Sequence, residues 1–209
     1  MNSPTHMAVH NLFPVPIGAC KIDRPLTKTE EEFILNQETV QNLGNLASVD
    51  TYILDHKKME GLRRILQEHL NYYFKNVFLP RNEVRIQITQ SWLNYTSPKS
   101  FHHKHAHPNS YISGVFYVKA KKEFDKIHFT RTMYEPIKLN HDEWNMYNSE
   151  TWWLGVESGD LLLFPSSTFH SVETVQSDET RVSLAFNSYL VGSIGEDRAL
   201  SRLTLGEPR

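Results

Sequence analysis

The chain has 209 residues, of which 39% are hydrophobic and 22% charged, and its formal net charge is -2. These values predict a globular protein with one domain, or at most two small ones. The near-neutral charge argues against nucleic-acid binding, which needs a basic excess or a basic stripe. The single cysteine, Cys20, excludes an internal disulfide framework and thiolate-rich metal sites. We expect a soluble, cytoplasmic protein, because there is no apolar run of about 20 residues and no secretory signal.

The first 82 residues are predicted to hold an extended segment and two helices. Leu12–Ile17 is apolar but twice interrupted by proline, which is typical of an edge strand or an extended segment. Pro25–Gly44 is predicted as a helix that ends at its glycine and begins with a capping box. Two pairs fit that box, Thr27 with Glu30 and Thr29 with Glu32. Asp55–Val77 has apolar residues at helical spacing and ends before Pro80. Both helices are expected to brace a sheet.

From Glu83 the hydrophobic period changes to two. Val84, Ile86, Ile88 and Trp92 are predicted to share one face of a strand. The further strand candidates are Tyr111–Val118, Lys126–Met133, Thr151–Leu154, Asp160–Phe164, Phe169–Val175 and Thr180–Val191. Many short strands without intervening helices predict an all-β sandwich or barrel. Residues 135–150 are predicted to form a long loop over one end of it. We expect a single domain, with a β core at 83–192 and a tail at 193–209.

Four of the eleven histidines lie between positions 102 and 107. His103, His105 and His107 are two residues apart, so in an extended strand they project from one face. Imidazole is the commonest metal ligand at neutral pH, and residues at i and i+2 of a strand can share one ion through bonds of about 2 Å. A further ligand must come from elsewhere, and His170, beyond the apolar run 161–164, is the candidate. The simpler alternatives are a surface patch of histidines and a structural role for His170.

An arginine, Arg181, lies near the start of the strand predicted after His170. Arg181, Ser183, Ala185 and Asn187 are predicted to share one face of it. An arginine in so apolar a sheet needs a partner. Its planar fork suits a carboxylate, and the Ser183 hydroxyl can donate to the same group. This face is therefore predicted to bind a dicarboxylate cosubstrate, and a structural ion pair is the simpler alternative.

The order of these segments resembles the iron(II)- and 2-oxoglutarate-dependent oxygenases, and in detail a bacterial and phage family of the prolyl hydroxylase-like superfamily. The matching segments are Leu12–Pro14, Ser91–Asn94, His105–Pro108 with Ser113–Tyr117, Gly159–Pro165 with His170, and Arg181–Ser183 with Phe186 and Asn187. They are spread over most of the chain. The resemblance implies a mainly β fold, the double-stranded β-helix or jelly roll, with bracing N-terminal helices. It also implies Fe(II) as cofactor and 2-oxoglutarate and O2 as cosubstrates.

The resemblance also implies roles for single residues. His105 and His170 would be metal ligands, and Arg181, aided by Ser183, would hold the distal carboxylate of 2-oxoglutarate. Tyr95 lies where related enzymes carry a tyrosine that contacts the cosubstrate. Asn187 is placed among the cosubstrate-binding residues as well.

One departure from the family's pattern concerns the metal. The superfamily usually supplies two histidines and one carboxylate, whereas the second residue after His105 is His107. Three interpretations remain open: a three-histidine site, two histidines with an open position, or a register that uses His103 and His105. We favour His105, His107 and His170, because Pro108 closes the strand after them. Such a neutral ligand set would leave the iron more positive than usual.

The predicted activity is hydroxylation of a C–H bond in a protein (prolyl) or small-molecule substrate, with release of succinate and carbon dioxide. The residues predicted to carry it are His105, His107, His170 and Arg181. Two alternatives remain, a cupin-like three-histidine metalloenzyme without 2-oxoglutarate and a non-catalytic jelly-roll binding module. The cupin-like enzyme would have no need for Arg181 and Ser183. The binding module would keep its ligand after the metal is removed.

Overall fold

The computed structural model describes residues 7–81, 83–132, 137 and 139–206. The strands are β1 (Gly18–Lys21), β2 (Thr39–Gln41), β3 (Leu46–Ser48), β4 (Val84–Thr96), β5 (His102–His105), β6 (Ile112–Lys119), β7 (Lys126–Thr130), β8 (Thr151–Gly155), β9 (Asp160–Pro165), β10 (His170–Val172), β11 (Arg181–Ile194) and β12 (Leu203–Leu205). The helices are α1 (Lys28–Leu35) and α2 (Glu60–Tyr73), with 3-10 turns η1 (Ile53–Asp55) and η2 (Lys57–Met59) and a π turn η3 (Phe74–Phe78).

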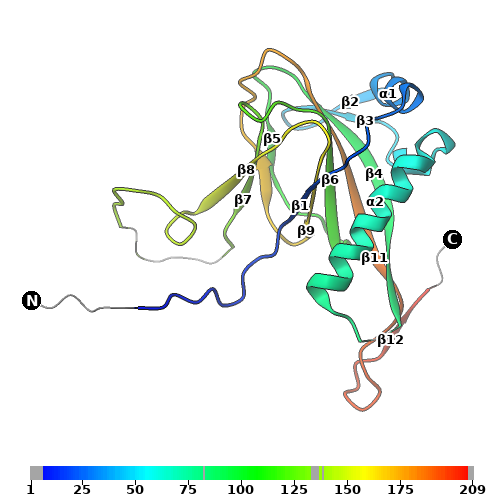
Figure 1. Cartoon of the computed structure of the whole chain (residues 1–209), viewed down its shortest axis with the longest axis vertical. Helices are drawn as coiled ribbons and strands as arrows, with labels where there is room; N and C mark the ends of the chain where they lie inside the picture. Colours follow the sequence, from blue (N-terminus) through cyan, green and yellow to red (C-terminus); the bar gives the residue numbers. More distant parts are fainter. Residues whose placement is uncertain (1–6, 82, 133–136, 138, 207–209) are drawn as a thin grey trace, which may run out of the picture.

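Two antiparallel sheets and a helical layer make up the molecule (Figure 1). The larger sheet has the order β1-β9-β6-β11-β4-β3-β2, with β12 beside β11, and the smaller sheet has the order β5-β10-β7-β8. The helix α2 covers one face of the larger sheet, and the smaller sheet lies on the other side (Figure 1). The predicted jelly roll with N-terminal bracing helices is therefore confirmed. The single-domain assignment and its divisions stay predictions.

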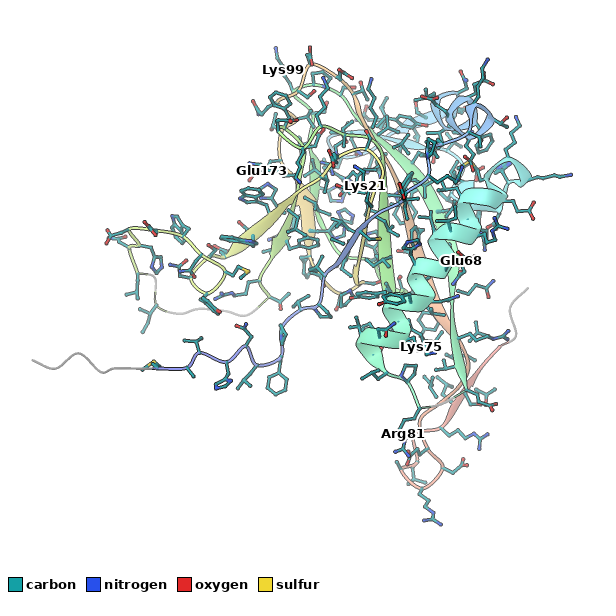
Figure 2. All side chains as sticks on the ribbon, viewed as in Figure 1. Lys21, Glu68, Lys75, Arg81, Lys99 and Glu173 are labelled. Atoms are coloured by element: carbon teal, nitrogen blue, oxygen red, sulfur yellow. The ribbon has the colours of Figure 1, made fainter. Side chains whose placement is uncertain are left out.

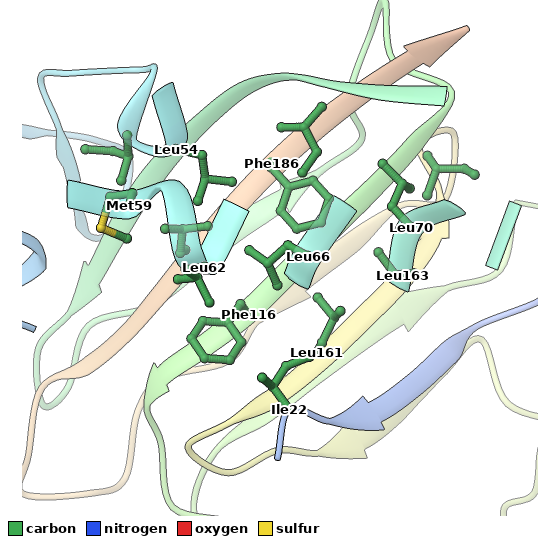
Figure 3. Close-up of a cluster of buried hydrophobic side chains, with 14 of the residues drawn as sticks. Ile22, Leu54, Met59, Leu62, Leu66, Leu70, Phe116, Leu161, Leu163 and Phe186 are labelled. Atoms are coloured by element: carbon green, nitrogen blue, oxygen red, sulfur yellow. The ribbon is translucent and has the colours of Figure 1, made fainter. Parts of the chain in front are cut away.

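The helical layer is held to the larger sheet by an apolar cluster (Figure 3). Leu62, Leu66 and Leu70 recur every four residues along α2 and are buried. They pack against Phe116 and Phe186 from the centre of the sheet, while charged side chains such as Glu68 and Lys75 are exposed (Figure 2). Each fully buried leucine contributes roughly 2 kcal/mol. This cluster uses one face of the sheet and leaves the opposite face for the site.

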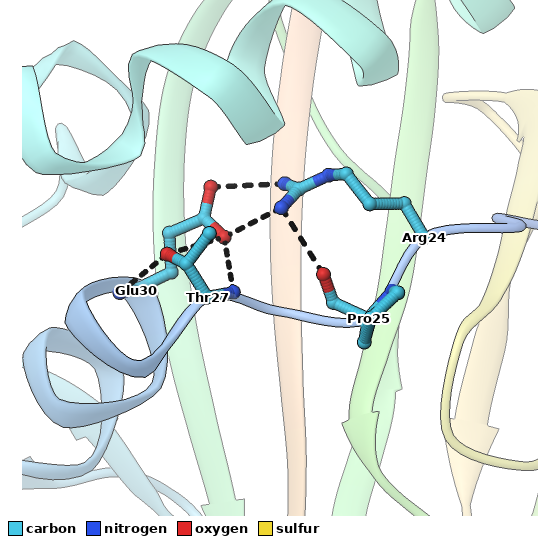
Figure 4. A network of polar contacts seen from close by, with 4 residues as sticks. All are labelled: Arg24, Pro25, Thr27 and Glu30. Carbon is cyan, nitrogen blue, oxygen red and sulfur yellow. Dashed lines mark hydrogen bonds and ion pairs between the residues drawn. The ribbon is translucent and has the colours of Figure 1, made fainter.

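The predicted capping box of the first helix forms between Thr27 and Glu30 (Figure 4). The Glu30 backbone N–H donates to the Thr27 hydroxyl at 3.2 Å, and the Thr27 N–H donates back to the Glu30 carboxylate at 2.8 Å. Arg24 donates to both oxygens of that carboxylate, each at 2.9 Å. Burial alone would raise the pKa of Glu30, but these hydrogen bonds outweigh it and lower the pKa. The network fixes where α1 begins.

The end predicted for this helix, at Gly44, is wrong. The helix α1 ends at Leu35, because the Asn36 and Gln37 side chains donate to the carbonyls of Glu32 and Phe33 and so satisfy its last turn. The following residues form the hairpin of β2 and β3. Gly44 lies in its turn with φ +92°, a conformation that favours glycine.

The second helix is shorter at both ends than the predicted Asp55–Val77. It begins with the 3-10 turns η1 and η2 and passes after Tyr73 into the π turn η3. The wider turn rotates Val77 off the apolar face, and its side chain is exposed. Leu79, in the left-handed region at φ 45°, and Pro80 then end the segment.

The strand predictions hold in the core of the fold and shift near its edges. Residues 12–17, expected as an edge strand or an extended segment, form no strand, and β1 begins at Gly18, where it pairs with β9. The short strands β2, β3 and β12 were not predicted. Met133 and the first residues of the predicted loop at 135–150 lie outside the described residues, and the described part of that loop projects away from the sheets (Figure 1). No helix among the described residues is long and apolar enough to cross a membrane.

A β-bulge in β4 changes the faces of its residues. Ile88 pairs with Ser188 and Ser91 pairs with Phe186, so two residues of β4 lie opposite the single residue Asn187. Ile86 and Ile88 therefore pack under the helices, whereas Trp92 turns to the face between the sheets. The prediction that all of them share one face is wrong.

Gly114 tests the packing of the larger sheet. A Cβ at Gly114 would lie 2.1 Å from the ring of Phe186, which is fully buried. We expect Gly114→Ala to lower the free energy of unfolding by about 1–3 kcal/mol, because the ring has no free space to move into. Urea denaturation measures this. Gly155→Ala is the control, since its new Cβ would meet nothing closer than 3.5 Å. Equal midpoints for both variants would contradict the packing described here.

Candidate metal centre

Three histidines meet at the rim of the smaller sheet. His105 and His170 are direct partners across the antiparallel pair of β5 and β10, and their ring centroids are 4.4 Å apart. His107 lies two residues beyond β5, where its backbone N–H donates to the Ser166 carbonyl at 2.9 Å. Its Nε2 atom lies 3.3 Å from Nε2 of His170, and the two rings are parallel. The structure thus brings together the three predicted ligands.

The other nitrogen of the His105 and His170 rings already forms a hydrogen bond. Nδ1 of His105 donates to the His103 carbonyl at 2.8 Å, and Nδ1 of His170 donates to the Thr168 carbonyl at 3.0 Å. These bonds leave Nε2 of both rings as bare acceptors. The His107 ring has a side-chain hydrogen bond with Asn187. Such contacts fix the tautomer and the orientation of metal-binding imidazoles.

This donor set fits a divalent transition metal. The ligand atoms of His105, His107 and His170 all lie within 4.8 Å of one another. The 3.3 Å between the two Nε2 atoms is close to the roughly 3 Å that separates adjacent ligands with metal–nitrogen bonds of about 2.1 Å. Two imidazole nitrogens at that distance need a cation or a proton between them. The arrangement therefore fits a metal that imidazole binds well, such as iron or zinc.

The same histidines are held in the neutral form. Burial lowers the pKa of His170 to about 3 and that of His107 to about 4. Burial also lowers the pKa of His105. A metal binds only the unprotonated ring, so no proton competes with it near neutral pH.

A second bulge, in β5, breaks the predicted alternation of the histidines. His105 pairs with His170 but His102 pairs with Val172, so three steps along β5 match two along β10. The ring of His102 stacks on that of His105 at 4.6 Å, in addition to the tilted ring of His170 at 4.4 Å. His107 lies beyond the strand. The rings of His103 and His107 nevertheless lie 4.9 and 5.0 Å from that of His105, so the three are adjacent as their spacing predicts, and the bulge adds His102 to them.

An arginine is buried between the sheets without a carboxylate partner. Arg181 is 4% exposed, and its Nη1 donates to the Lys126 carbonyl at 3.0 Å. Among the described residues, no carboxylate forms an ion pair with it. Its guanidinium carbon lies 5.0 Å over the ring of Tyr117. A buried guanidinium without a counter-charge is costly, so this position calls for an anion.

Tyr117 is a site residue that the sequence prediction missed. Its hydroxyl is fully buried beside the Arg181 guanidinium, and no described residue accepts its proton. Burial raises the pKa of Tyr117, so the hydroxyl is a neutral donor. Tyr117 pairs with Ser183, which places both on the face of Arg181. The segment Ser113–Tyr117 carried part of the family resemblance, and the period of two along β6 was the available signal. A carboxylate would satisfy Arg181 and Tyr117 together.

Two predicted cosubstrate residues lie elsewhere. Tyr95 pairs with Val182 on the helix-facing side of the sheet, and its hydroxyl donates to the Ile34 carbonyl. It cannot reach the face of Arg181, which corrects its predicted role. Asn187 is on the inner face, but it is six residues from Arg181, or about 20 Å along a strand. Its contacts are with His107 and with the Ser113 hydroxyl, so it supports the histidines.

Trp92 also belongs to the site, where it was not expected. Its ring stacks on that of His107 at 5.4 Å. The β4 bulge turned it to this face. At the other end of the site, Arg181 borders a cavity of about 180 Å³ that His128 and Glu173 also line. A larger hollow of about 770 Å³ lies between β12 and the outer ends of β4 and β11. None of the site histidines lines it, so we assign it no part in this chemistry.

Comparison with known families agrees with this geometry. Residues 90–187, a little less than half of the chain, match the sequence model of the family described as "Putative 2OG-Fe(II) oxygenase". Over these residues the chain is similar to the 2OG-Fe(II) oxygenases. Iron(II) and 2-oxoglutarate are the metal and the cosubstrate of that family. No curated protein matches the sequence.

Solved structures of low sequence identity share the fold. HygX from Streptomyces hygroscopicus, with nickel and 2-oxoglutarate bound, is 12% identical with a TM-score of 0.59, over 83% of this chain and 82% of that one. A Pseudomonas putida prolyl-4-hydroxylase is 12% identical with a TM-score of 0.53, over 83% and 92%. An oxidoreductase of the 2OG-Fe(II) oxygenase family from Burkholderia pseudomallei is 14% identical with a TM-score of 0.54, over 76% and 74%. These likenesses establish the jelly roll of the oxygenase fold.

The buried histidines predict a pH-dependent stability for the metal-free protein. Because the pKa values of His107 and His170 are lowered, the unfolded chain binds more protons than the folded one between about pH 6.5 and pH 4. Their stabilising contribution is therefore present above pH 6.5 and is lost as the pH falls. We expect each of these two rings to lower the free energy of unfolding by on the order of 1–2 kcal/mol as the pH falls from 6.5 to 5. Urea denaturation across this range measures the slope. His107→Gln should flatten it, and an unchanged slope in that variant would contradict the assignment.

Proposed function

We propose that the protein is an iron(II)- and 2-oxoglutarate-dependent oxygenase that hydroxylates a C–H bond of its substrate. The observation that carries the proposal is the pairing of two sets of groups on one inner face. Three neutral imidazoles lie near the rim, and a buried guanidinium, which forms no ion pair with a carboxylate among the described residues, lies at the start of β11. The family match supports the same function.

The histidines would hold the metal. His105, His107 and His170 supply three nitrogen ligands, which leaves positions free for a chelating oxo acid and for oxygen. When bound, iron(II) would supply the oxygen activation and oxidative decarboxylation that such enzymes couple to hydroxylation. The Trp92 ring stacked on His107 shields this side of the ligands from water.

Arg181, Tyr117 and Ser183 would hold the distal carboxylate of 2-oxoglutarate. The guanidinium supplies the charge, and the Tyr117 hydroxyl gains the acceptor that it lacks. Burial keeps these donors in a low dielectric, where a charge-assisted hydrogen bond is strong. The oxo acid would thereby be fixed with its other end toward the histidines.

Titration under anaerobic conditions tests the proposal. We expect iron(II) followed by 2-oxoglutarate to give the weak visible metal-to-ligand charge-transfer band, and His170→Ala to abolish it. Iron binding without the band would favour the cupin-like metalloenzyme that lacks 2-oxoglutarate. Failure to bind either would leave the non-catalytic binding module.

Variants of the carboxylate site give a graded prediction. We expect Arg181→Gln to weaken 2-oxoglutarate binding roughly 100-fold and Tyr117→Phe roughly 10-fold, since they remove a charged and a neutral hydrogen bond. Titration of the charge-transfer band measures both dissociation constants. Tyr95→Phe is the matched control, because its hydroxyl bonds the Ile34 carbonyl on the opposite face. Tight binding by Arg181→Gln, or a loss in Tyr95→Phe equal to that in Tyr117→Phe, would show that the carboxylate site is misplaced.

A further inference from the structure

A second group of histidines lies beside the first. The rings of His102, His103 and His105 have centroid separations of 4.6, 4.9 and 5.2 Å. Those of His105, His107 and His170 are 4.4, 5.0 and 5.1 Å. In both groups the ligand atoms lie within 4.8 Å of one another. The second group is therefore as compact as the first.

The β5 bulge creates this second group. In a regular strand, residues 102 and 105 would point to opposite faces. The register shift opposite β10 instead stacks the His102 ring on that of His105. His103 stays half-buried at the edge, where its Nδ1 lies 3.4 Å from the Leu43 carbonyl, a weak contact that leaves the ring free to turn.

His105 is common to both groups. Its Nδ1 faces the His103 carbonyl and its Nε2 is the bare nitrogen, so it has one lone pair to offer. A metal in one group therefore excludes a metal in the other. The two groups also differ in access, since His107 and His170 are buried and His102 and His103 are half-buried.

We propose that His102, His103 and His105 form a second metal site that binds zinc, nickel or copper ions in competition with iron at the first site. The proposal rests on the proposed function only in taking His105 as an iron ligand. Three imidazoles bind copper, nickel and zinc more strongly than iron(II). An ion bound by the second group occupies Nε2 of His105, so the first group keeps only two ligands for iron. Late transition metals would thereby switch off iron binding without occupying the iron position.

Metal binding to variants of the apoprotein tests this without any turnover. Zinc stoichiometry and affinity are measured by calorimetry and elemental analysis. We expect one zinc per wild-type chain, one bound as tightly in His107→Ala/His170→Ala, and one bound at least 10-fold more weakly in His102→Ala/His103→Ala. His105→Ala should weaken zinc binding at least 10-fold, since it removes a ligand from both groups. His69→Ala is the control and should match wild type, since His69 is a half-buried histidine of α2 whose Nδ1 donates to the Ile65 carbonyl.

The outcomes separate the two proposals. If His107→Ala/His170→Ala binds no zinc while His102→Ala/His103→Ala does, the second site does not exist and the proposed function stands. The reverse result would overturn the iron site and leave the second group as the metal site. Two zinc ions per wild-type chain would overturn the sharing of His105.

A single variant keeps the test valid if a double variant does not fold. His103 is half-buried, so His103→Ala is expected to leave the fold and the iron site intact. In the anaerobic titration, zinc should suppress the charge-transfer band of wild type. We expect His103→Ala to need at least 10-fold more zinc for the same loss. An equal requirement would show that zinc acts by replacing iron directly, and the second site would be overturned.

Discussion

The site depends on the antiparallel pairing of His105 with His170 across β5 and β10. These strands are only four and three residues long, so their own ladder is too short to hold two imidazoles in register. The stability comes from the larger sheet, whose other face is packed by α2. From that sheet project Tyr117 and Arg181, and the loop after β9 supplies the Ser166 carbonyl that anchors His107. The smaller sheet carries His105 and His170, and the larger sheet determines where they meet His107.

The charges of the site explain why a dianion fits it. The three imidazoles are neutral, because burial lowers the pKa of each. Arg181 is buried without a carboxylate among the described residues. A divalent metal therefore adds to a positive charge that the protein does not compensate. In the usual two-histidine, one-carboxylate set, one charge of the metal is neutralised by the protein. Here the compensation is left to whatever binds between the metal and Arg181.

Much of the fold could be predicted from the sequence, because it depends on periodicity in the long elements. The apolar spacing that defines α2, the capping box of Thr27 and Glu30, and the strands β6, β9 and β11 all follow from local patterns. The end of α1 could not be predicted from the position of Gly44. The Asn36 and Gln37 side chains end the helix earlier, because they donate hydrogen bonds to the carbonyls of its last turn. The edge strand β1 exists only because β9 lies beside it. Its sequence has no pattern that requires pairing.

The site residues likewise divide into those that local patterns could predict and those that depend on the folded structure. His105 meets His170, and Arg181 shares a face with Ser183, as the sequence pattern predicts, while their roles stay predictions. Tyr95 lies on the opposite face, and Tyr117 was missed. The alternation rule fails at the two bulges, and both lie beside the site. In β4 the extra residue turns Trp92 onto His107, and in β5 it turns His102 onto His105. A bulge bends a strand and redirects one side chain at the expense of one pairing, so it is favoured where chemistry needs a direction that a regular strand cannot give. The bulges at which the period-two rule fails are therefore also the features that bring five imidazoles together at one rim.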